Sequence, residues 1–187
     1  MTTAAVVLAA GAGRRFGGPT HKLLADFRGR PLWTWSLDAA VAAELDEVIV
    51  VMGAVTLAPL PAGVRAVHND AWAEGQAMSV QTAIHAASAA GHRAIVVGLA
   101  DQPLVTAAAW RAVAVADDPD RPIAVATYHG RRGNPVRLAD AVWPLLPRIG
   151  DAGARVVVAE RPELVVEVAC EGEPADVDTL EDLTRWS

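Results

Sequence analysis

Residues 5–22, AVVLAAGAGRRFGGPTHK, decide the fold because they join a short apolar run to a glycine-rich, cationic loop. The apolar run, residues 5–9, ends in small residues, as expected of a buried strand. The loop contains Gly11 and Gly13 and leads to Lys22. Glycine lets backbone N–H groups approach anionic oxygens closely, and side-chain cations neutralise the charge on those oxygens. The stretch therefore predicts a strand that opens into a site for an anionic group, first of all the triphosphate of a nucleotide.

Two other phosphate loops match this stretch less well. A dinucleotide-binding Rossmann loop has a glycine where this chain has Phe16, although Gly17 could serve a variant spacing. It also has an acidic residue at the end of the second strand, which here reads Met52-Gly53-Ala54. A Walker loop needs Gly-Lys-Ser/Thr after the glycines, and this loop has none. What remains is a loop in which the cationic side chains of Arg15 and Lys22 bind the anion together with the backbone N–H groups. The alternative is that both are solvated surface charges.

Apolar runs alternate with helical patterns along the whole chain, which predicts βαβ units and a mainly parallel sheet. We expect one domain over residues 1–187. The expected strands are residues 5–9, 46–52, 64–67, 94–100, 122–128 and 164–169. Helices are expected from Pro31 onward and over residues 76–90, 106–117, 139–147, 151–160 and 178–186, with a turn over residues 130–135.

Composition and charge exclude several classes of function. The chain has 187 residues, 52% of them hydrophobic and 20% charged, with a formal net charge of −6. A nucleic-acid partner would normally select a basic face, so we expect none. No apolar run is long enough to span a bilayer, and we expect neither a membrane segment nor a signal peptide. Cys170 is the only cysteine, so no internal disulfide can form, and a cytoplasmic location is expected.

Two aspartates are candidate metal ligands. Asp101 directly follows an apolar strand, and in open α/β sheets the carboxyl ends of the strands are where ligands bind. The alternative for Asp101 is a turn before Pro103. Asp178, with Glu181, matches a helix N-cap and its capping-box partner, a role that could be complete in itself. Two aspartates delivered to one sheet edge would form an oxygen site for Mg²⁺, an ion that keeps several waters and bridges phosphates.

Several segments, in order along the chain, resemble the MobA-like nucleotidyltransferase family, and within it the molybdenum cofactor cytidylyltransferases. Residues 8–17, LAAGAGRRFG, with Lys22 resemble the signature LAAGxSxRMGxxK. The other segments that resemble family motifs are GRPL at 29–32, NDAWAEG at 69–75 with Ser79, LADQP at 99–103, GDAGAR at 150–155 and DVDT at 176–179.

The resemblance implies a three-layer α/β/α Rossmann-like nucleotidyltransferase fold and transfer of CMP from CTP to the phosphate of molybdopterin, with release of pyrophosphate. It implies that Arg15, Lys22 and Asp101 are catalytic and that Asp101 and Asp178 hold Mg²⁺. The residues that it implies for nucleotide binding are Leu8, Ala10, Gly11, Gly13, Arg15, Lys22, Gly75 and Ser79.

The resemblance also concerns substrates and partners. LAAG rather than LAGG resembles the CTP-using members, and contact with a molybdenum hydroxylase is implied. Gly133-Asn134-Pro135 stands where the family pattern has GHP, close to where the acceptor would bind. Three alternatives stay open: a nucleotidylyltransferase that uses a sugar phosphate or GTP, a dinucleotide-binding redox protein, and a non-catalytic nucleotide-binding or cofactor-delivery protein.

Overall fold

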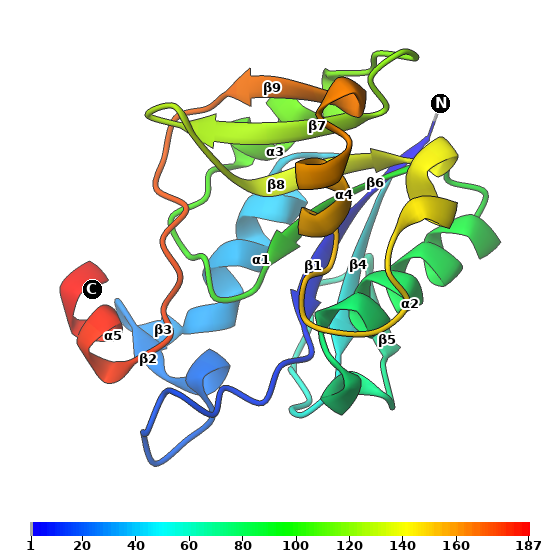
Figure 1. Cartoon of the computed structure of the whole chain (residues 1–187). Helices are drawn as coiled ribbons and strands as arrows, with labels where there is room; N and C mark the ends of the chain where they lie inside the picture. Colours follow the sequence, from blue (N-terminus) through cyan, green and yellow to red (C-terminus); the bar gives the residue numbers. More distant parts are fainter. Residues whose placement is uncertain (1) are drawn as a thin grey trace.

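A computed structural model describes residues 2–187 and shows a central sheet covered by helices on both faces (Figure 1). Over those residues the main sheet has seven strands in the order β5-β4-β1-β6-β8-β7-β9. These strands are β1 (Thr3–Ala9), β4 (Glu47–Met52), β5 (Val64–His68), β6 (Ala94–Leu99), β7 (Ile123–Tyr128), β8 (Arg131–Ala139) and β9 (Val165–Ala169). Two short strands, β2 (Asp26–Phe27) and β3 (Arg30–Pro31), pair separately.

The helices follow most of the expected ranges. The α-helices are α1 (Leu32–Ala42), α2 (Gln76–Ala89), α3 (Ala107–Val115), α4 (Arg155–Glu160) and α5 (Leu180–Trp186). The 3₁₀ helices are η1 (Lys22–Leu24), η2 (Trp72–Glu74), η3 (Asp140–Leu145) and η4 (Pro162–Leu164). The helix expected over 139–147 is thus a 3₁₀ helix with Pro144 inside it, and the one expected over 151–160 begins only at Arg155.

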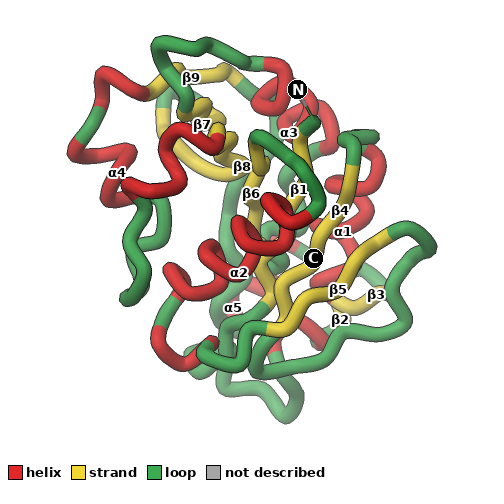
Figure 2. Tube along the Cα trace, turned by 90° about the vertical axis from the view of Figure 1, so that its right-hand side faces the viewer, coloured by secondary structure: helices red, strands yellow, loops and turns green. Residues whose placement is uncertain are grey.

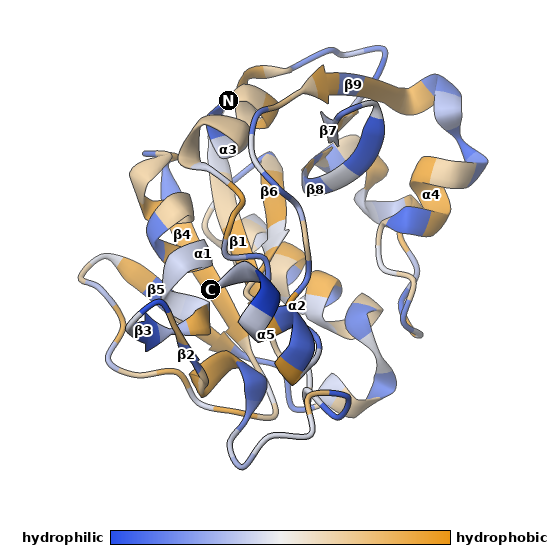
Figure 3. Ribbon diagram, turned by 90° about the vertical axis from the view of Figure 1, so that its left-hand side faces the viewer, coloured by the Kyte–Doolittle hydropathy of each residue, from blue (hydrophilic) through white to orange (hydrophobic). Residues whose placement is uncertain are grey.

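Alternation along β1 builds the two halves of the core. Ala5, Val7 and Ala9 pack in the cluster that holds α1 and α3. The intervening residues, among them Val6, pack in the cluster that holds α2 and α4. Because successive strand residues point to opposite faces, a strand buried on both faces is apolar throughout. The expected α/β/α layering is confirmed (Figure 2), and hydrophobic strands run through the middle of the fold (Figure 3).

The sheet is mainly parallel, as expected, with one strand that the sequence did not predict. β8 runs antiparallel to both of its neighbours, β6 and β7. The expected turn over residues 130–135 is wrong in extent, because the chain reverses at His129-Gly130 and then continues as β8. Glycine, asparagine and proline near the start of β8 gave this stretch the composition of a turn. The antiparallel direction brings the first residues of β8 to the carboxyl ends of β1 and β6.

None of the helices over residues 2–187 has the length and apolar character that crossing a membrane requires.

Candidate active site

The glycine-rich loop after β1 closes on itself through His21. The Nε2 atom of His21 lies 2.9 Å from the carbonyl oxygen of Gly11, and its Nδ1 atom accepts a hydrogen bond from the backbone N–H of Leu23 at 3.2 Å. Since a carbonyl oxygen only accepts, Nε2 is the donor in the contact with Gly11. Gly13, at φ +62°, would place a Cβ atom 3.0 Å from Cγ of Lys22. The loop therefore holds Lys22 close against its own backbone.

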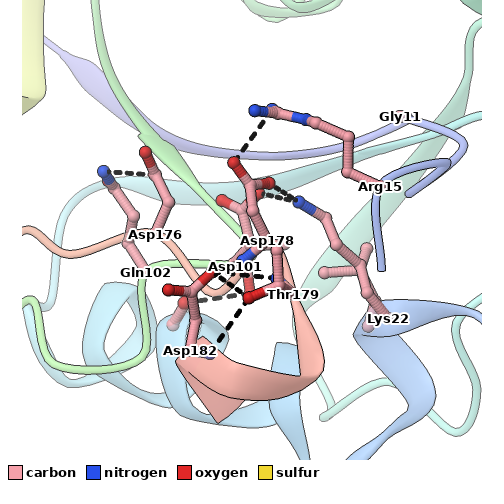
Figure 4. A network of polar contacts seen from close by, with 12 residues as sticks. Gly11, Arg15, Lys22, Asp101, Gln102, Asp176, Asp178, Thr179 and Asp182 are labelled. Carbon is pink, nitrogen blue, oxygen red and sulfur yellow. Dashed lines mark hydrogen bonds and ion pairs between the residues drawn. The ribbon is translucent and has the colours of Figure 1, made fainter. Parts of the chain in front are cut away.

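Lys22 joins the two predicted aspartates. Its Nζ atom lies 2.5 Å from Oδ2 of Asp101 and 2.8 Å from Oδ1 of Asp178, and Arg15 lies 2.9 Å from Oδ2 of Asp178 (Figure 4). The backbone N–H of Val177 donates to the carbonyl of Asp101 at 2.9 Å, which fixes the C-terminal segment beside the end of β6. Four charged residues expected at one site, from three separate segments, are therefore in direct contact.

The N-cap of α5 is not Asp178, as the sequence suggested, but Thr179. The hydroxyl of Thr179 accepts from the backbone N–H of Asp182, and the carboxylate of Asp182 accepts from the backbone N–H of Thr179. The capping box is therefore shifted by one residue from the expected Asp178–Glu181 pair. Consequently the carboxylate of Asp178 is free to face Lys22 and Arg15.

The charges at the site alter two pKa values. Burial lowers the pKa of the Lys22 amine, but the attraction and hydrogen bonds of Asp101 and Asp178 outweigh burial and raise it above its ordinary value. Lys22 is therefore a cation at neutral pH, and its attraction to the aspartates stabilises the fold fully below its ordinary pKa and is lost as the pH rises from there through the raised pKa. Burial, followed by the charges of Asp101 and Asp178, raises the pKa of Asp176. The site concentrates negative charge that a cation would neutralise.

The residues present suit a magnesium ion. Oδ1 of Asp101 is buried and, among the described residues, has no hydrogen-bond partner. Asp101 and Asp178 each place an oxygen within 2.8 Å of the same Lys22 nitrogen, so one cation can contact both. Residues 2–187 contain no group of three His, Cys, Asp or Glu side chains arranged to hold a metal. Two carboxylates suffice for Mg²⁺, whose other ligands are waters and substrate phosphates.

A cleft of about 1010 Å³ extends from the glycine-rich loop between α2 and β8. Its volume is at the upper end of the range for small-molecule sites, and it could hold two ligands side by side. A smaller cavity of about 230 Å³ lies against the loop itself. The cleft is lined by every residue that the sequence assigned to the site, namely Leu8, Ala10, Gly11, Gly13, Arg15, Lys22, Gly75, Ser79, Asp101 and Asp178.

The start of α2 is held in place by two contacts. Ser79 is buried and accepts a hydrogen bond from Nδ2 of Asn69 at 3.0 Å, which fixes the connection that leads into the helix. The crossing segment, residues 147–154, passes over the same helix end (Figure 1). The carbonyl oxygen of Gly150 accepts a hydrogen bond from the backbone N–H of Ala77 at 2.9 Å. The backbone N–H of Gly150 donates to the backbone carbonyl oxygen of Glu74 at 3.1 Å. The crossing segment thus forms one wall of the cleft.

Gly75 permits this close approach, and we expect Gly75→Ala to detach the crossing segment. The residue has φ +111°, and a Cβ atom would lie 2.5 Å from the carbonyl carbon and oxygen of Gly150. We expect a loss of unfolding free energy of roughly 2–4 kcal/mol, because left-handed strain and backbone overlap both contribute. Thermal denaturation measures it. Gly91→Ala is the matched control, since Gly91 also has positive φ (+83°) but open space around it. Equal losses in the two variants would show that the contact with Gly150 contributes nothing.

The cleft is also lined by three polar residues to which the sequence assigned no role: Gln102, Asn134 and Asp176. They accompany Asp101 and Asp178, which we call the acidic pair. Gln102 follows Asp101 directly, and Asp176 lies two residues before Asp178, so proximity in sequence could have signalled both. For Asn134 the signal was its place in Gly133-Asn134-Pro135, where the family pattern has GHP, but its contact with Gln102 depends on β8 and could not be predicted.

Comparison with known proteins was made by sequence and by structure. The family model described as the MobA-like NTP transferase domain matches residues 5–165. Nicotine blue oxidoreductase of Paenarthrobacter nicotinovorans is 34% identical over 96% of this chain and 94% of its own length. Purine catabolism protein PucB of Bacillus subtilis is 32% identical over 95% of this chain and 92% of its own length.

Solved structures of one mycobacterial protein share the whole fold. Rv0371c of Mycobacterium tuberculosis superposes with a TM-score of 0.82 at 32% identity, covering 99% of this chain and 97% of its own. A complex of the same protein with manganese gives a TM-score of 0.80 at 31% identity, covering 100% of this chain and 98% of its own.

Proposed function

Since the chain belongs to the MobA-like NTP transferase family and is a nucleotidyltransferase of that type, we propose that it transfers CMP from CTP to the phosphate of molybdenum-bound molybdopterin in the cytoplasm, releasing pyrophosphate. The observation that carries the proposal is the contact of Lys22 with both Asp101 and Asp178 at the glycine-rich loop. This arrangement supports the proposal, because two cations and a pair of carboxylates that could hold a metal lie together beside the loop that would bind the triphosphate. The manganese complex of the related mycobacterial protein is in keeping with a divalent ion at such a site.

The proposed reaction needs positioning and charge stabilisation more than acid–base chemistry. An oxygen of the acceptor phosphate attacks the α-phosphorus of CTP, and the bond from that phosphorus to the bridging oxygen of the β-phosphate breaks. The acceptor phosphate is already ionised at neutral pH, so no general base is required. Arg15 and Lys22 would stabilise the charge on the departing pyrophosphate. Mg²⁺ held by Asp101 and Asp178 would supply positive charge next to the α-phosphate.

The remaining residues of the cleft would bind the two substrates. Backbone N–H groups at Gly11 and Gly13 would hold the triphosphate, with the nucleoside between the loop and the start of α2, where Gly75 and Ser79 lie. The cleft continues beyond this region to the first residues of β8, and its volume leaves room there for the acceptor. An acceptor of this kind implies delivery of the product to a molybdenum hydroxylase.

A redox function is the second candidate, because one relative, at 34% identity, is named an oxidoreductase. A redox enzyme of this fold would bind a nicotinamide dinucleotide in the cleft, without need of a divalent ion. The strand β4 argues against it, since β4 ends at Met52, is followed by Gly53, and lacks at this end the acidic residue that binds a ribose in dinucleotide sites.

Pyrophosphate release separates these functions. We expect purified protein with Mg²⁺ and molybdopterin to release pyrophosphate from CTP faster than from GTP, ATP or UTP. Preference for another triphosphate or for a sugar phosphate would overturn the proposed substrates while keeping the reaction class. Tight nucleotide binding with no release under any acceptor would indicate a non-catalytic binding protein. NADH binding without metal, together with no release, would favour the redox function.

A further inference from the structure

A bulge in β8 brings the side chain of Asn134 to Gln102, the residue that follows Asp101. Val136 of β8 pairs with Val125 of β7, but the next residue of β7, Ala126, pairs with Gly133. Asn134 and Pro135 therefore have no partner in β7. The pairing of β8 with β6 also stops at Val136. Such bulges commonly redirect a side chain near a functional site. Here the bulge directs Asn134 toward the residues that follow β6.

Asn134 orients the amide of Gln102. Nε2 of Gln102 donates to the carbonyl of Pro174 and to Oδ1 of Asp176, both at 2.9 Å. Because a carbonyl only accepts, this contact fixes which end of the amide faces Pro174. Oε1 of Gln102 then faces Asn134, whose Nδ2 donates to it at 3.1 Å. Asn134 is held in turn by Tyr128, whose hydroxyl donates to its backbone carbonyl at 2.7 Å.

The amide of Gln102 secures the segment that carries Asp178. Residues 174–178 belong to no helix or strand, and the backbone bond from Val177 to Asp101 is their contact with the end of β6. Gln102, only 5% exposed, adds two side-chain bonds just before that point. Figure 4 shows Asp176 turned toward Gln102, whereas Asp178 faces Lys22. Gln102 thus holds one carboxylate of the segment away from Lys22 and leaves the other beside it.

We propose that Gln102, oriented by Asn134, is a positioning residue that sets the placement of Asp178 against Asp101 for a divalent cation. The inference rests on the carboxylate pair of the proposed function. It assigns Asn134, which stands where the family pattern has histidine, the role of a hydrogen-bond donor to Gln102. Histidine can also donate through a ring N–H, so either residue type can orient the amide. Partners of this kind around metal ligands contribute to metal affinity without touching the ion.

Binding of Mn²⁺ alone, followed by electron paramagnetic resonance of the free ion, tests this role without turnover. We expect Gln102→Met to weaken Mn²⁺ binding by about 10- to 100-fold, the range for partners that orient metal ligands. Asn134→Leu keeps Gln102 but removes the donor to its Oε1, so that the amide is held through Nε2 alone, and should weaken binding by about tenfold. Asn134→His should bind Mn²⁺ as the wild type does. The KM for metal should rise in the weakened variants, whereas the KM for nucleotide at saturating metal should not.

Gln81→Met is the matched control. Nε2 of Gln81 also donates to backbone carbonyls, those of Leu146 and Pro147, at 3.4 and 3.1 Å, and these three residues are not among those that line the cleft with Asp101 and Asp178. The Gln81→Met variant should have a lower thermal stability than the wild type but the same affinity for Mn²⁺. If Gln102→Met does not fold, the comparison of Asn134→Leu with Asn134→His decides. Wild-type affinity in Gln102→Met or in Asn134→Leu, or equal weakening in Gln81→Met, would overturn the inference while leaving the proposed function intact. A wild-type protein that binds no Mn²⁺ would overturn both.

Discussion

Asp101→Asn is expected to slow pyrophosphate release by roughly 10²–10⁴-fold, because a metal and its ligand contribute several kcal/mol to stabilising the developing charge. The variant keeps the size of the side chain but removes the charge of the carboxylate whose buried Oδ1 has no hydrogen-bond partner within residues 2–187. An amide can still accept a hydrogen bond from Lys22 through its oxygen, so the fold should survive. Steady-state rates at saturating CTP and Mg²⁺, with circular dichroism of the same sample, measure both.

Asp38→Asn provides the control for this prediction. Asp38 makes a similar ion pair, with Arg30 at 2.7 Å, but on the exposed surface of α1. We expect its turnover to equal that of the wild type. Turnover by Asp101→Asn within a few-fold of the wild type would remove the metal from the mechanism, whatever the control shows.

Lys22→Met is expected to move metal binding and turnover in opposite directions. In the structure the Lys22 ammonium lies between Asp101 and Asp178 with its side chain only 11% exposed, so an entering divalent ion must compete with it. Removing a charged hydrogen-bond donor worth about 1.5–3 kcal/mol should tighten binding of Mn²⁺ alone by roughly 10- to 100-fold. Turnover should fall by about 10²–10³-fold, because the charge that stabilises the departing pyrophosphate is also lost.

Arg121→Met controls for loss of a positive charge elsewhere. Arg121 pairs with Asp118 at 2.8 Å on the protein surface, and its removal should change neither Mn²⁺ affinity nor turnover. The competition would be disproved by unchanged or weaker Mn²⁺ binding in Lys22→Met. Unchanged turnover would instead show that Lys22 only neutralises the aspartates and takes no part in the reaction.

The elements that fix the carboxyl edge of the sheet could be predicted from local pattern. β1 and β6 are apolar throughout because both faces are covered, and this is visible in sequence as an uninterrupted run. Asp101 follows such a run directly, and in a parallel sheet the ends of neighbouring strands meet at one edge. The glycines and cations after β1 therefore had to face the residues after β6. These relations hold for most chains that alternate strands and helices.

Three features could not be predicted from local pattern, because they depend on contacts between residues far apart in the sequence: β8, the cap of α5 and the contact of Asn134 with Gln102. The composition of residues 130–135 predicts a turn where the first residues of β8 lie, and the strand forms there because of hydrogen bonds with β6 and β7. The cap of α5 was assigned one residue too early, since Asp178 and Thr179 are both good capping residues and only tertiary contacts decide between them. Asn134 could not be linked to Gln102 without β8 and its bulge.

Lys22 is the single lysine among the 187 residues; the other permanently cationic side chains all belong to arginines. A compact ammonium fits between two carboxylates, whereas a planar guanidinium would spread beyond them. The protein consequently carries one ε-amine, and that amine lies between Asp101 and Asp178 in the wall of the cleft. Because acylation requires the neutral amine, the aspartates that keep Lys22 charged and enclosed also protect the single lysine of this chain from reactive acyl donors.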